Sequence, residues 1–229
     1  MFNRFNTIYK LLKLSKKEPD ISGPVMAIGG AEDKTTHGKI LQKFFELAGG
    51  KGCDITIVPW ASDKPKRGKL YQKIFKSLGA KEVVLLDPKD REKALEAFDK
   101  SAAIFFVGGD HKKLLDILER LDLIKPIQNS NKGGALVGGT SAGASILSEH
   151  MPYWNDEEGK LHWYRGLALV PDSIIDQHYS QRHRVKRLEE SVKRFEGSIG
   201  YGIDEDTAII FEHNKEPVII GSGKVTIMK

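Results

Sequence analysis

Residues 102–109 read AAIFFVGG, an unbroken apolar run that ends in two glycines. Such a run, with no polar residue on either face, indicates a strand buried on both sides in a parallel sheet. Similar runs precede and follow it, and amphipathic stretches separate them, which is the rhythm of βαβ units. The other strands of this part are expected at 24–30, 54–60, 82–87 and 134–139, and the helices at 38–50, 69–80, 91–98 and 111–121.

The rhythm changes after residue 150. The segment HMPYWNDEEGKLHWY (150–164) is expected to be an irregular polar and aromatic loop, and SIIDQHYS (173–180) to end a strand. A helix is predicted to start near Ser180, and residues 199–229 to form short antiparallel strands. The predicted fold class is α/β, with a mainly parallel, doubly wound sheet and an antiparallel C-terminal flank.

Residues 24–229 are predicted to be a single α/β domain, because no linker interrupts them. Residues 1–23 are predicted to be a basic amphipathic arm that packs on this body or on a partner subunit. Attachment of the arm to a membrane surface is the alternative. No segment is apolar over the length that a bilayer requires, so we expect no membrane partner and a cytoplasmic location.

The composition narrows the function classes. The net charge of +5 and the pI near 9.1 suit nucleic-acid binding, but equally an enzyme whose substrate carries carboxylates. The single cysteine, Cys53, excludes an intrachain disulfide and a cysteine-based metal site. We expect neither a metal nor another cofactor.

The segment GGTSAGAS (138–145) contains the pattern G-x-S-x-G between a predicted strand and a predicted helix. A serine at the tip of such a turn adopts a strained backbone conformation, so its neighbours must be small. The turn also aims the helix N-terminus at developing negative charge. Ser141 is therefore the candidate nucleophile. A harmless structural loop and a phosphate-binding loop are the alternatives, although no P-loop lysine follows.

A nucleophilic serine needs a base and an acid that orients the base. His178 is the first candidate base among the seven histidines, because it ends an apolar run at the same sheet edge, and His111 is the second. Glu205 is the candidate acid, with Asp204 and Asp206 as competitors. The chain order serine, histidine, acid disfavours the α/β-hydrolases, in which the acid precedes the histidine.

Backbone groups and arginines complete the predicted site. The N–H groups of Gly109 and Ala142 are candidate oxyanion donors. Arg182, Arg184 and Arg187 follow the candidate base closely, which suits a grip on carboxylates. A solvated basic face is the alternative. Nucleic-acid binding is disfavoured, because glutamates dilute the cluster and no aromatic stacking platform accompanies it.

Five segments together resemble the cyanophycinases, within the peptidase E-like serine hydrolases of peptidase family S51. They are AIGGAEDK, FFVGGDH, GGTSAGAS, DQHYSQRHRVKRL and GYGIDEDTA, and the resemblance runs from about Val25 to the C-terminus. It implies a three-layer sandwich like that of the class I glutamine amidotransferases. It also implies Ser141 as nucleophile, His178 as base and Glu205 as acid, in a homodimer that needs no metal.

The resemblance further implies the substrate. Cyanophycinases release β-aspartyl-arginine dipeptides from cyanophycin, a poly-aspartate whose β-carboxyls carry arginine. The substrate groove would be lined by Asp176, Gln177 and the three arginines Arg182, Arg184 and Arg187. His111 stands where cyanophycinases usually carry glutamine, so a related β-aspartyl polymer stays open as the substrate. The alternatives are an α-aspartyl dipeptidase of the peptidase E type and a non-catalytic protein that binds an acidic polymer.

Overall fold

The computed structural model describes residues 23–155 and 158–229, and the predicted arm lies outside these residues except for Gly23. Its main sheet has seven strands in the order β11-β10-β1-β5-β4-β2-β3. Their bounds are β1 Val25–Ile28, β2 Asp54–Val58, β3 Glu82–Leu85, β4 Ala103–Phe106, β5 Leu136–Thr140, β10 Thr207–Phe211 and β11 Val218–Gly221. Strands β1 to β5 run parallel, while β10 and β11 are antiparallel. The α/β prediction with an antiparallel C-terminal flank is confirmed.

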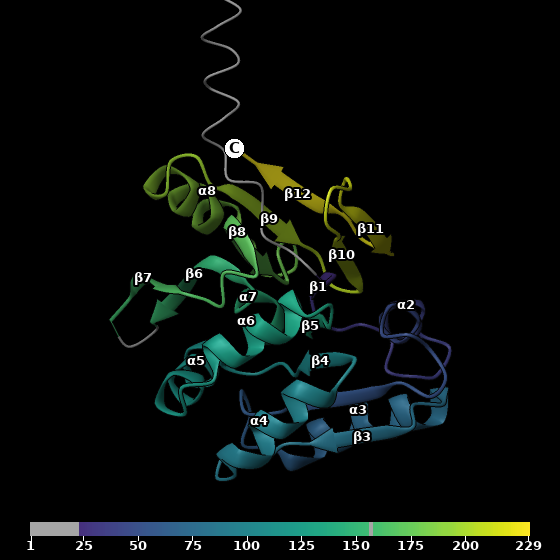
Figure 1. The fold of residues 1–229 in the computed structure, drawn as a ribbon. Helices are drawn as coiled ribbons and strands as arrows, with labels where there is room; N and C mark the ends of the chain where they lie inside the picture. The colour runs from purple at the N-terminus through teal and green to yellow at the C-terminus, as the bar shows by residue number, and fades with distance from the viewer. Residues whose placement is uncertain (1–22, 156–157) are drawn as a thin grey trace, which may run out of the picture.

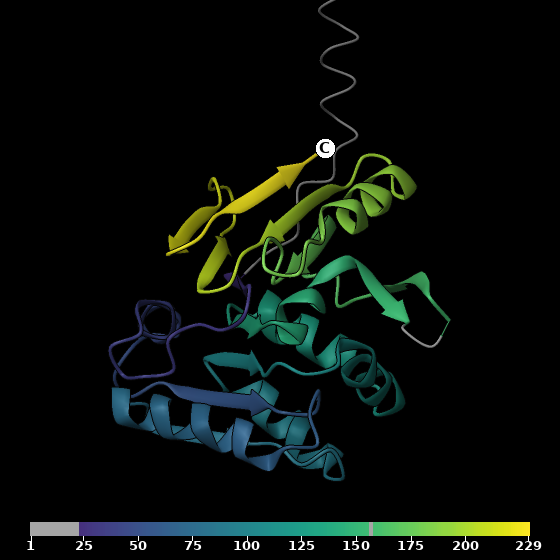
Figure 2. The same ribbon diagram turned by 180° about the vertical axis from the view of Figure 1, so that it is seen from behind.

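Helices cover both faces of this sheet, because its strands are apolar on both faces. Within β1, Met26 and Ile28 pack with residues of α2 (Lys39–Leu47) and α3 (Pro65–Leu78). Val25 and Ala27 face the opposite core, which is covered by α4 (Arg91–Lys100), α5 (His111–Arg120), α6 (Ile124–Lys132) and α7 (Ala142–Ser145). Figure 2 shows α3 at the edge of the sheet that β2 and β3 form.

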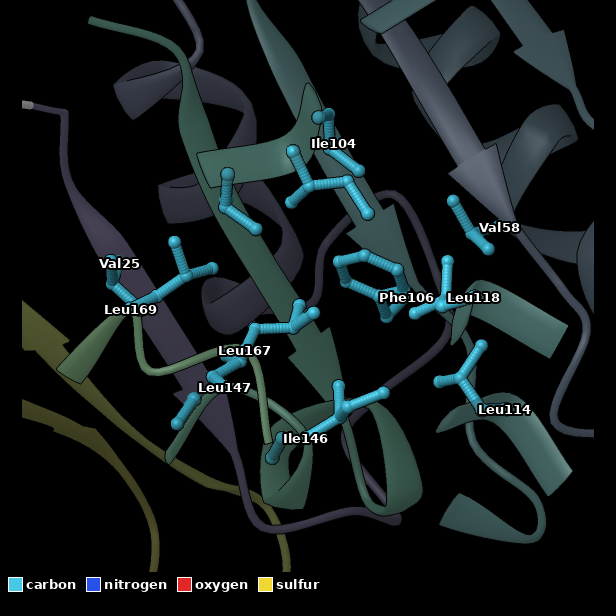
Figure 3. Close-up of a cluster of buried hydrophobic side chains, with 14 of the residues drawn as sticks. Val25, Val58, Ile104, Phe106, Leu114, Leu118, Ile146, Leu147, Leu167 and Leu169 are labelled. Carbon is cyan, nitrogen blue, oxygen red and sulfur yellow. The ribbon is translucent and has the colours of Figure 1, made fainter. Parts of the chain in front are cut away.

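The core of the second face joins the sheet to the C-terminal half of the chain. In Figure 3, Phe106 of β4 lies among Leu114 and Leu118 of α5, and Ile146 and Leu147 follow α7 close by. All of these side chains are buried. Helix α6 was not predicted from the sequence. Its Pro126 lies in the first turn of the helix, where proline is tolerated.

A second sheet has five strands in the order β12-β9-β8-β6-β7 and lies beside α7 (Figure 1). Its strands are β6 Ser148–Asn155, β7 Lys160–Arg165, β8 Val170–Gln177, β9 Ile199–Ile203 and β12 Val225–Met228. The prediction of a loop over 150–164 was wrong, since β6 and β7 pair there as an antiparallel hairpin. Pro152 lies within β6, opposite Trp163 of β7, and beyond the point where the strand's pairing with β8 ends at His150.

Two further predictions about this half need correction. Strand β9 pairs in parallel with β8 and antiparallel only with β12, so residues 199–229 are not all antiparallel. Helix α8 spans Val185–Arg194 and does not begin near Ser180. His183 has a φ of 52°, a left-handed conformation that cannot lie within a right-handed helix. Arg182 therefore lies in the turn before α8. Within residues 23–155 and 158–229, every helix is too short or too polar to cross a membrane.

Candidate active site

Ser141 lies on a sharp turn between β5 and α7. Its φ of 55° and ψ of −114° lie outside the conformations that a non-glycine residue prefers. The chain is tightly packed here, since a Cβ atom added to Gly143 would meet the Phe106 carbonyl oxygen at 2.2 Å. The neighbours of Ser141 must therefore be small, which agrees with the steric reasoning from the sequence.

Ser141, His178 and Glu205 form a continuous hydrogen-bonded chain. The Nε2 atom of His178 lies 2.9 Å from Ser141 Oγ, and Nδ1 lies 2.5 Å from Glu205 Oε1. A carboxylate accepts at Nδ1, so the imidazole carries its proton there and leaves Nε2 free to accept from the serine. The three residues come from the ends of β5 and β8 and from the turn between β9 and β10.

The two competing acids are engaged elsewhere. Asp204 is buried and accepts from the backbone N–H groups of Ser180 and Lys224. Asp206 accepts from the Ser222 hydroxyl. Of the three neighbouring acids, Glu205 is the one in contact with the imidazole.

The His178 ring is held where β8 meets the end of β1. Its backbone N–H donates to the Gly29 carbonyl at 2.9 Å. A Cβ atom added to Gly30 would lie 2.4 Å from Cε1 and 2.5 Å from Nε2 of the ring, so only glycine leaves room for it. Burial lowers the pKa of His178 and outweighs the raising effect of Glu205, and Arg182 lowers it further. The imidazole is therefore neutral at neutral pH, as a base must be.

The two predicted oxyanion donors differ in exposure, since Ala142 is fully buried. Gly109 lines the same hollow as Ser141, and Ala142 directly follows the serine at the start of α7. The backbone N–H groups of Gly109 and Ala142 have no acceptor among the hydrogen bonds of residues 23–155 and 158–229.

Gln177 and Asp176 are both buried, and Gln177 is the one of the two that contacts the serine. Oε1 of Gln177 lies 3.3 Å from Ser141 Oγ. Asp176 is fully buried, and its carboxylate accepts two hydrogen bonds from Arg187 and one from Arg184 at 3.2 Å. Burial also lowers the pKa of Arg184, to about 10. Any effect of Asp176 on a ligand therefore passes through the two arginines.

Two hollows flank Arg182. The first, of about 540 Å³, contains Ser141 and His178 and is walled by Gly108, Gly109 and side chains of the loop after β1 and of α3. The second, of about 520 Å³, is lined by His111, Arg184, Arg187 and Trp154 among others. Arg182 lines both, so it stands between the nucleophile and the other predicted arginines.

His111 lies in the wall of the second hollow and has no bond to Ser141. Its Nε2 lies 3.0 Å from the carbonyl oxygen of Pro152, which can only accept, so Nε2 carries the proton. The ring also packs edge-to-face on Tyr153. Burial lowers the pKa of His111 to about 4, so the ring is neutral at neutral pH. His111 thus ties the start of α5 to the β6–β7 hairpin.

One cluster in the site was missed by sequence reasoning. The fully buried side chain of Glu32 accepts from the Thr140 hydroxyl at 2.6 Å and from the Tyr71 hydroxyl at 2.5 Å. Burial and the nearby carboxylate both raise the pKa of Tyr71, which keeps its proton and remains a donor. Glu32 therefore fixes the residue before the nucleophile to the wall of the first hollow. The AEDK segment (31–34) was the available signal, but its pattern does not reveal these distant partners.

Comparison of the chain with known proteins identifies relatives among the cyanophycinases. The chain is 38% identical over 217 residues to the cyanophycinase of Geminocystis herdmanii, covering 89% of this chain and 79% of that one. It is 36% identical over 216 residues to the cyanophycinase of Trichormus variabilis, covering 89% and 72%.

Solved structures show the same fold at lower identity. A peptidase from an acI-B1 actinobacterium superimposes with a TM-score of 0.72 at 23% identity, covering 93% of each chain. A putative peptidase E from Listeria monocytogenes gives a TM-score of 0.66 at 23% identity, covering 88% of this chain and 99% of that one. These likenesses confirm the predicted three-layer α/β sandwich.

The protein is thus a peptidase, and a serine-type site fits its class. The family model for peptidase family S51 matches residues 25–219, and the chain belongs to that family.

Proposed function

We propose that the protein is a serine exopeptidase that hydrolyses cyanophycin, or a closely related β-aspartyl polymer, to β-aspartyl-arginine dipeptides. The observation that carries the proposal is the hydrogen-bonded chain from Ser141 through His178 to Glu205, in which Ser141 and His178 line the first hollow. The second hollow lies on the other side of Arg182. The cyanophycinases at 36–38% identity supply the substrate class.

The reaction follows from the placement of these groups. Ser141 Oγ attacks the scissile carbonyl carbon while its proton passes to His178 Nε2, and Glu205 stabilises the imidazolium that forms. The N–H groups of Gly109 and Ala142 hold the oxyanion. His178 then returns the proton to the leaving amine, which leaves an acyl group on Ser141. Water, activated by the same imidazole, hydrolyses this ester and restores the free serine.

The substrate side of the proposal rests on charge. Each unit of cyanophycin bears a free arginine carboxylate, and Arg182, Arg184 and Arg187 stand along the second hollow. Asp176 holds Arg184 and Arg187 in place, and His111 belongs to the same wall. Gln177 lies beside Ser141 instead. The α-aspartyl dipeptidase alternative is not favoured, because the relatives of highest identity reported above are cyanophycinases.

Incubation with purified cyanophycin, followed by mass analysis of the products, tests the proposal. The expected product is the β-aspartyl-arginine dipeptide, and Ser141→Ala should abolish its release without unfolding the protein. Ser77→Ala, an exposed serine on α3, is the matched control and should retain full activity. Release of aspartate from α-linked Asp-X peptides, with cyanophycin left intact, would favour the peptidase E alternative. No hydrolysis and no labelling of Ser141 by a fluorophosphonate would favour a binding protein.

We also propose that the enzyme is a cytoplasmic homodimer built on a single domain, residues 24–229. The edge strands β11 and β12 support the dimer, since Val218, Ile219 and Ile227 are about half exposed there. Sedimentation velocity of the protein and of an Ile219→Lys variant tests the dimer, and the variant should be monomeric. A chain that begins at Pro24 should stay folded and active if residues 1–23 are only an arm.

A further inference from the structure

The first hollow contains a cation that the proposed reaction does not use. Arg67 lies in the first turn of α3, is exposed, and lines the hollow together with Ser141 and His178. Its Nη1 donates to the Gly108 carbonyl at 3.2 Å. Its side chain has no carboxylate within ion-pair distance among residues 23–155 and 158–229. The guanidinium therefore keeps N–H donors and a full charge for a ligand.

The neighbouring charges make the hollow receptive to an anion. Within the part of the chain that the structure describes, its lining includes Lys34, Arg67 and Arg182 and no aspartate or glutamate. Lys34 lies 3.6 Å from the buried carboxylate of Glu32, which offsets its charge. Arg67 thus lines the hollow that contains the nucleophile without a carboxylate paired to it among the described residues.

The contact with Gly108 links Arg67 to the oxyanion donor. In a trans peptide the carbonyl and the following N–H point in opposite directions. The Gly108 carbonyl points toward Arg67, so the Gly109 N–H of the same peptide plane points away from it. Arg67 therefore contacts the carbonyl end of the Gly108–Gly109 peptide, and the other end of this peptide is the proposed oxyanion donor.

We propose that Arg67 is a specificity-determining residue that binds a free carboxylate of the substrate in the hollow that contains Ser141. This inference deepens the proposed function and rests on it for the substrate class. Two carboxylates of a β-aspartyl-arginine unit have the required chemistry, the aspartyl α-carboxylate at a chain end and the arginine α-carboxylate. A guanidinium fork fits either one with paired hydrogen bonds.

Three ligands distinguish the two sources. They are β-aspartyl-arginine, the same dipeptide with its aspartyl α-carboxylate converted to an amide, and β-aspartyl-agmatine, which lacks the arginine carboxylate. Their affinities are measured by calorimetry on the Ser141→Ala variant, so no turnover is needed. One of the two altered ligands should bind about 10- to 100-fold more weakly than the dipeptide, the range for a hydrogen bond to a charged group.

The variant Arg67→Gln, made in the Ser141→Ala background, should reduce that preference to less than about 3-fold. Lys66→Gln removes the same charge from the neighbouring exposed residue of α3 and should leave the preference unchanged. Thermal unfolding of each variant establishes that it is folded. If Arg67 serves only to orient the Gly108–Gly109 peptide, Arg67→Gln will lower kcat on all substrates in the Ser141 enzyme and leave the preference intact. That result overturns the proposal.

The two proposals fail in different ways. Hydrolysis of cyanophycin with an unchanged carboxylate preference in Arg67→Gln would sustain the function and reject the subsite. Loss of the preference in Arg67→Gln, in an enzyme that does not cleave cyanophycin, would sustain the subsite and reject the function.

Discussion

Nδ1 of His178 lies 2.5 Å from Oε1 of Glu205, although the two residues are 27 positions apart and follow different strands. Replacing this carboxylate by an amide tests its role. In Glu205→Gln the amide NH₂ can donate to Nδ1, which favours the tautomer with its proton on Nε2. That tautomer cannot accept the serine proton, so kcat should fall by about 10³- to 10⁴-fold, as for a misoriented triad histidine. Steady-state hydrolysis of cyanophycin measures the loss, and Asp206→Asn serves as the control. A fall of less than tenfold would remove Glu205 from the mechanism.

Gly30 leaves the space that the His178 ring occupies. The methyl group of Gly30→Ala would overlap the ring and displace the base, so kcat should fall by about 100-fold or more. Gly52→Ala is the matched control, because Gly52 also has a positive φ but has no atom near the added methyl. Both variants should lose about 1 kcal/mol of stability from the strained backbone, and only Gly30→Ala should lose activity. Equal activity of the two would show that the ring tolerates the methyl group.

The pH dependence of kcat/KM should report the His178 pKa, which burial and Arg182 both lower from 6.5. Activity needs the neutral imidazole, so it should rise with pH through a midpoint below 6.5 and stay high at neutral pH. Arg182→Gln removes a positive charge that disfavours the imidazolium, so its midpoint should move to higher pH. Lys186→Gln on α8 should leave the midpoint in place. A midpoint that moves to lower pH in Arg182→Gln would contradict this reading of the site.

His111 should make the fold sensitive to acid. Its pKa is about 4 in the folded protein, compared with an ordinary value of 6.5. Between these two pH values the histidine is protonated in the unfolded chain and neutral in the folded protein. The contribution of the neutral His111 ring to the free energy of unfolding is fully present above pH 6.5 and is lost as the pH falls from 6.5 to 4. The loss amounts to about 3 kcal/mol from a shift of this size.

In His111→Gln this part of the acid sensitivity should disappear, although the variant also loses the bond to Pro152. Urea unfolding at pH 7.5 and at pH 4.5 measures it, and the difference between the two pH values should shrink relative to the unchanged protein. His150 has its own lowered pKa and remains in both proteins, so its contribution cancels. An unchanged difference would mean that the imidazole is not buried as described.

The parallel strands of the main sheet could be predicted because unbroken apolar runs in the sequence indicate that they are buried on both faces. The run around Phe105 has no polar residue on either face, and the structure places it inside the main sheet, between β5 and β2. The segment 150–164 lacked such a signal. Pro152 and polar residues interrupt its alternation, and its pairing depends on a hairpin partner rather than on local preference.

The candidate site was predictable where chemistry and position agree. The sequence indicated Ser141 by its turn and His178 by its place at a strand end, and the structure brings them within hydrogen-bond distance. It did not indicate that Arg184 and Arg187 contact a carboxylate of their own chain, Asp176. Contacts of Glu32 and Arg67 with distant residues were also beyond reach, because no local pattern encodes them. The start of α8 was misplaced because the left-handed His183 leaves no mark in the sequence.

The ties between the end of β1 and the C-terminal strands have a consequence for synthesis. Strands β1 to β5 can place Ser141 on its turn, but His178 and Glu205 leave the ribosome later than these strands. The backbone bonds from His178 to Gly29 and from Asp206 to Gly30 form only when the segment 178–206 has joined the fold. A growing chain therefore carries a serine without its base until His178 and Glu205 have emerged and folded against it.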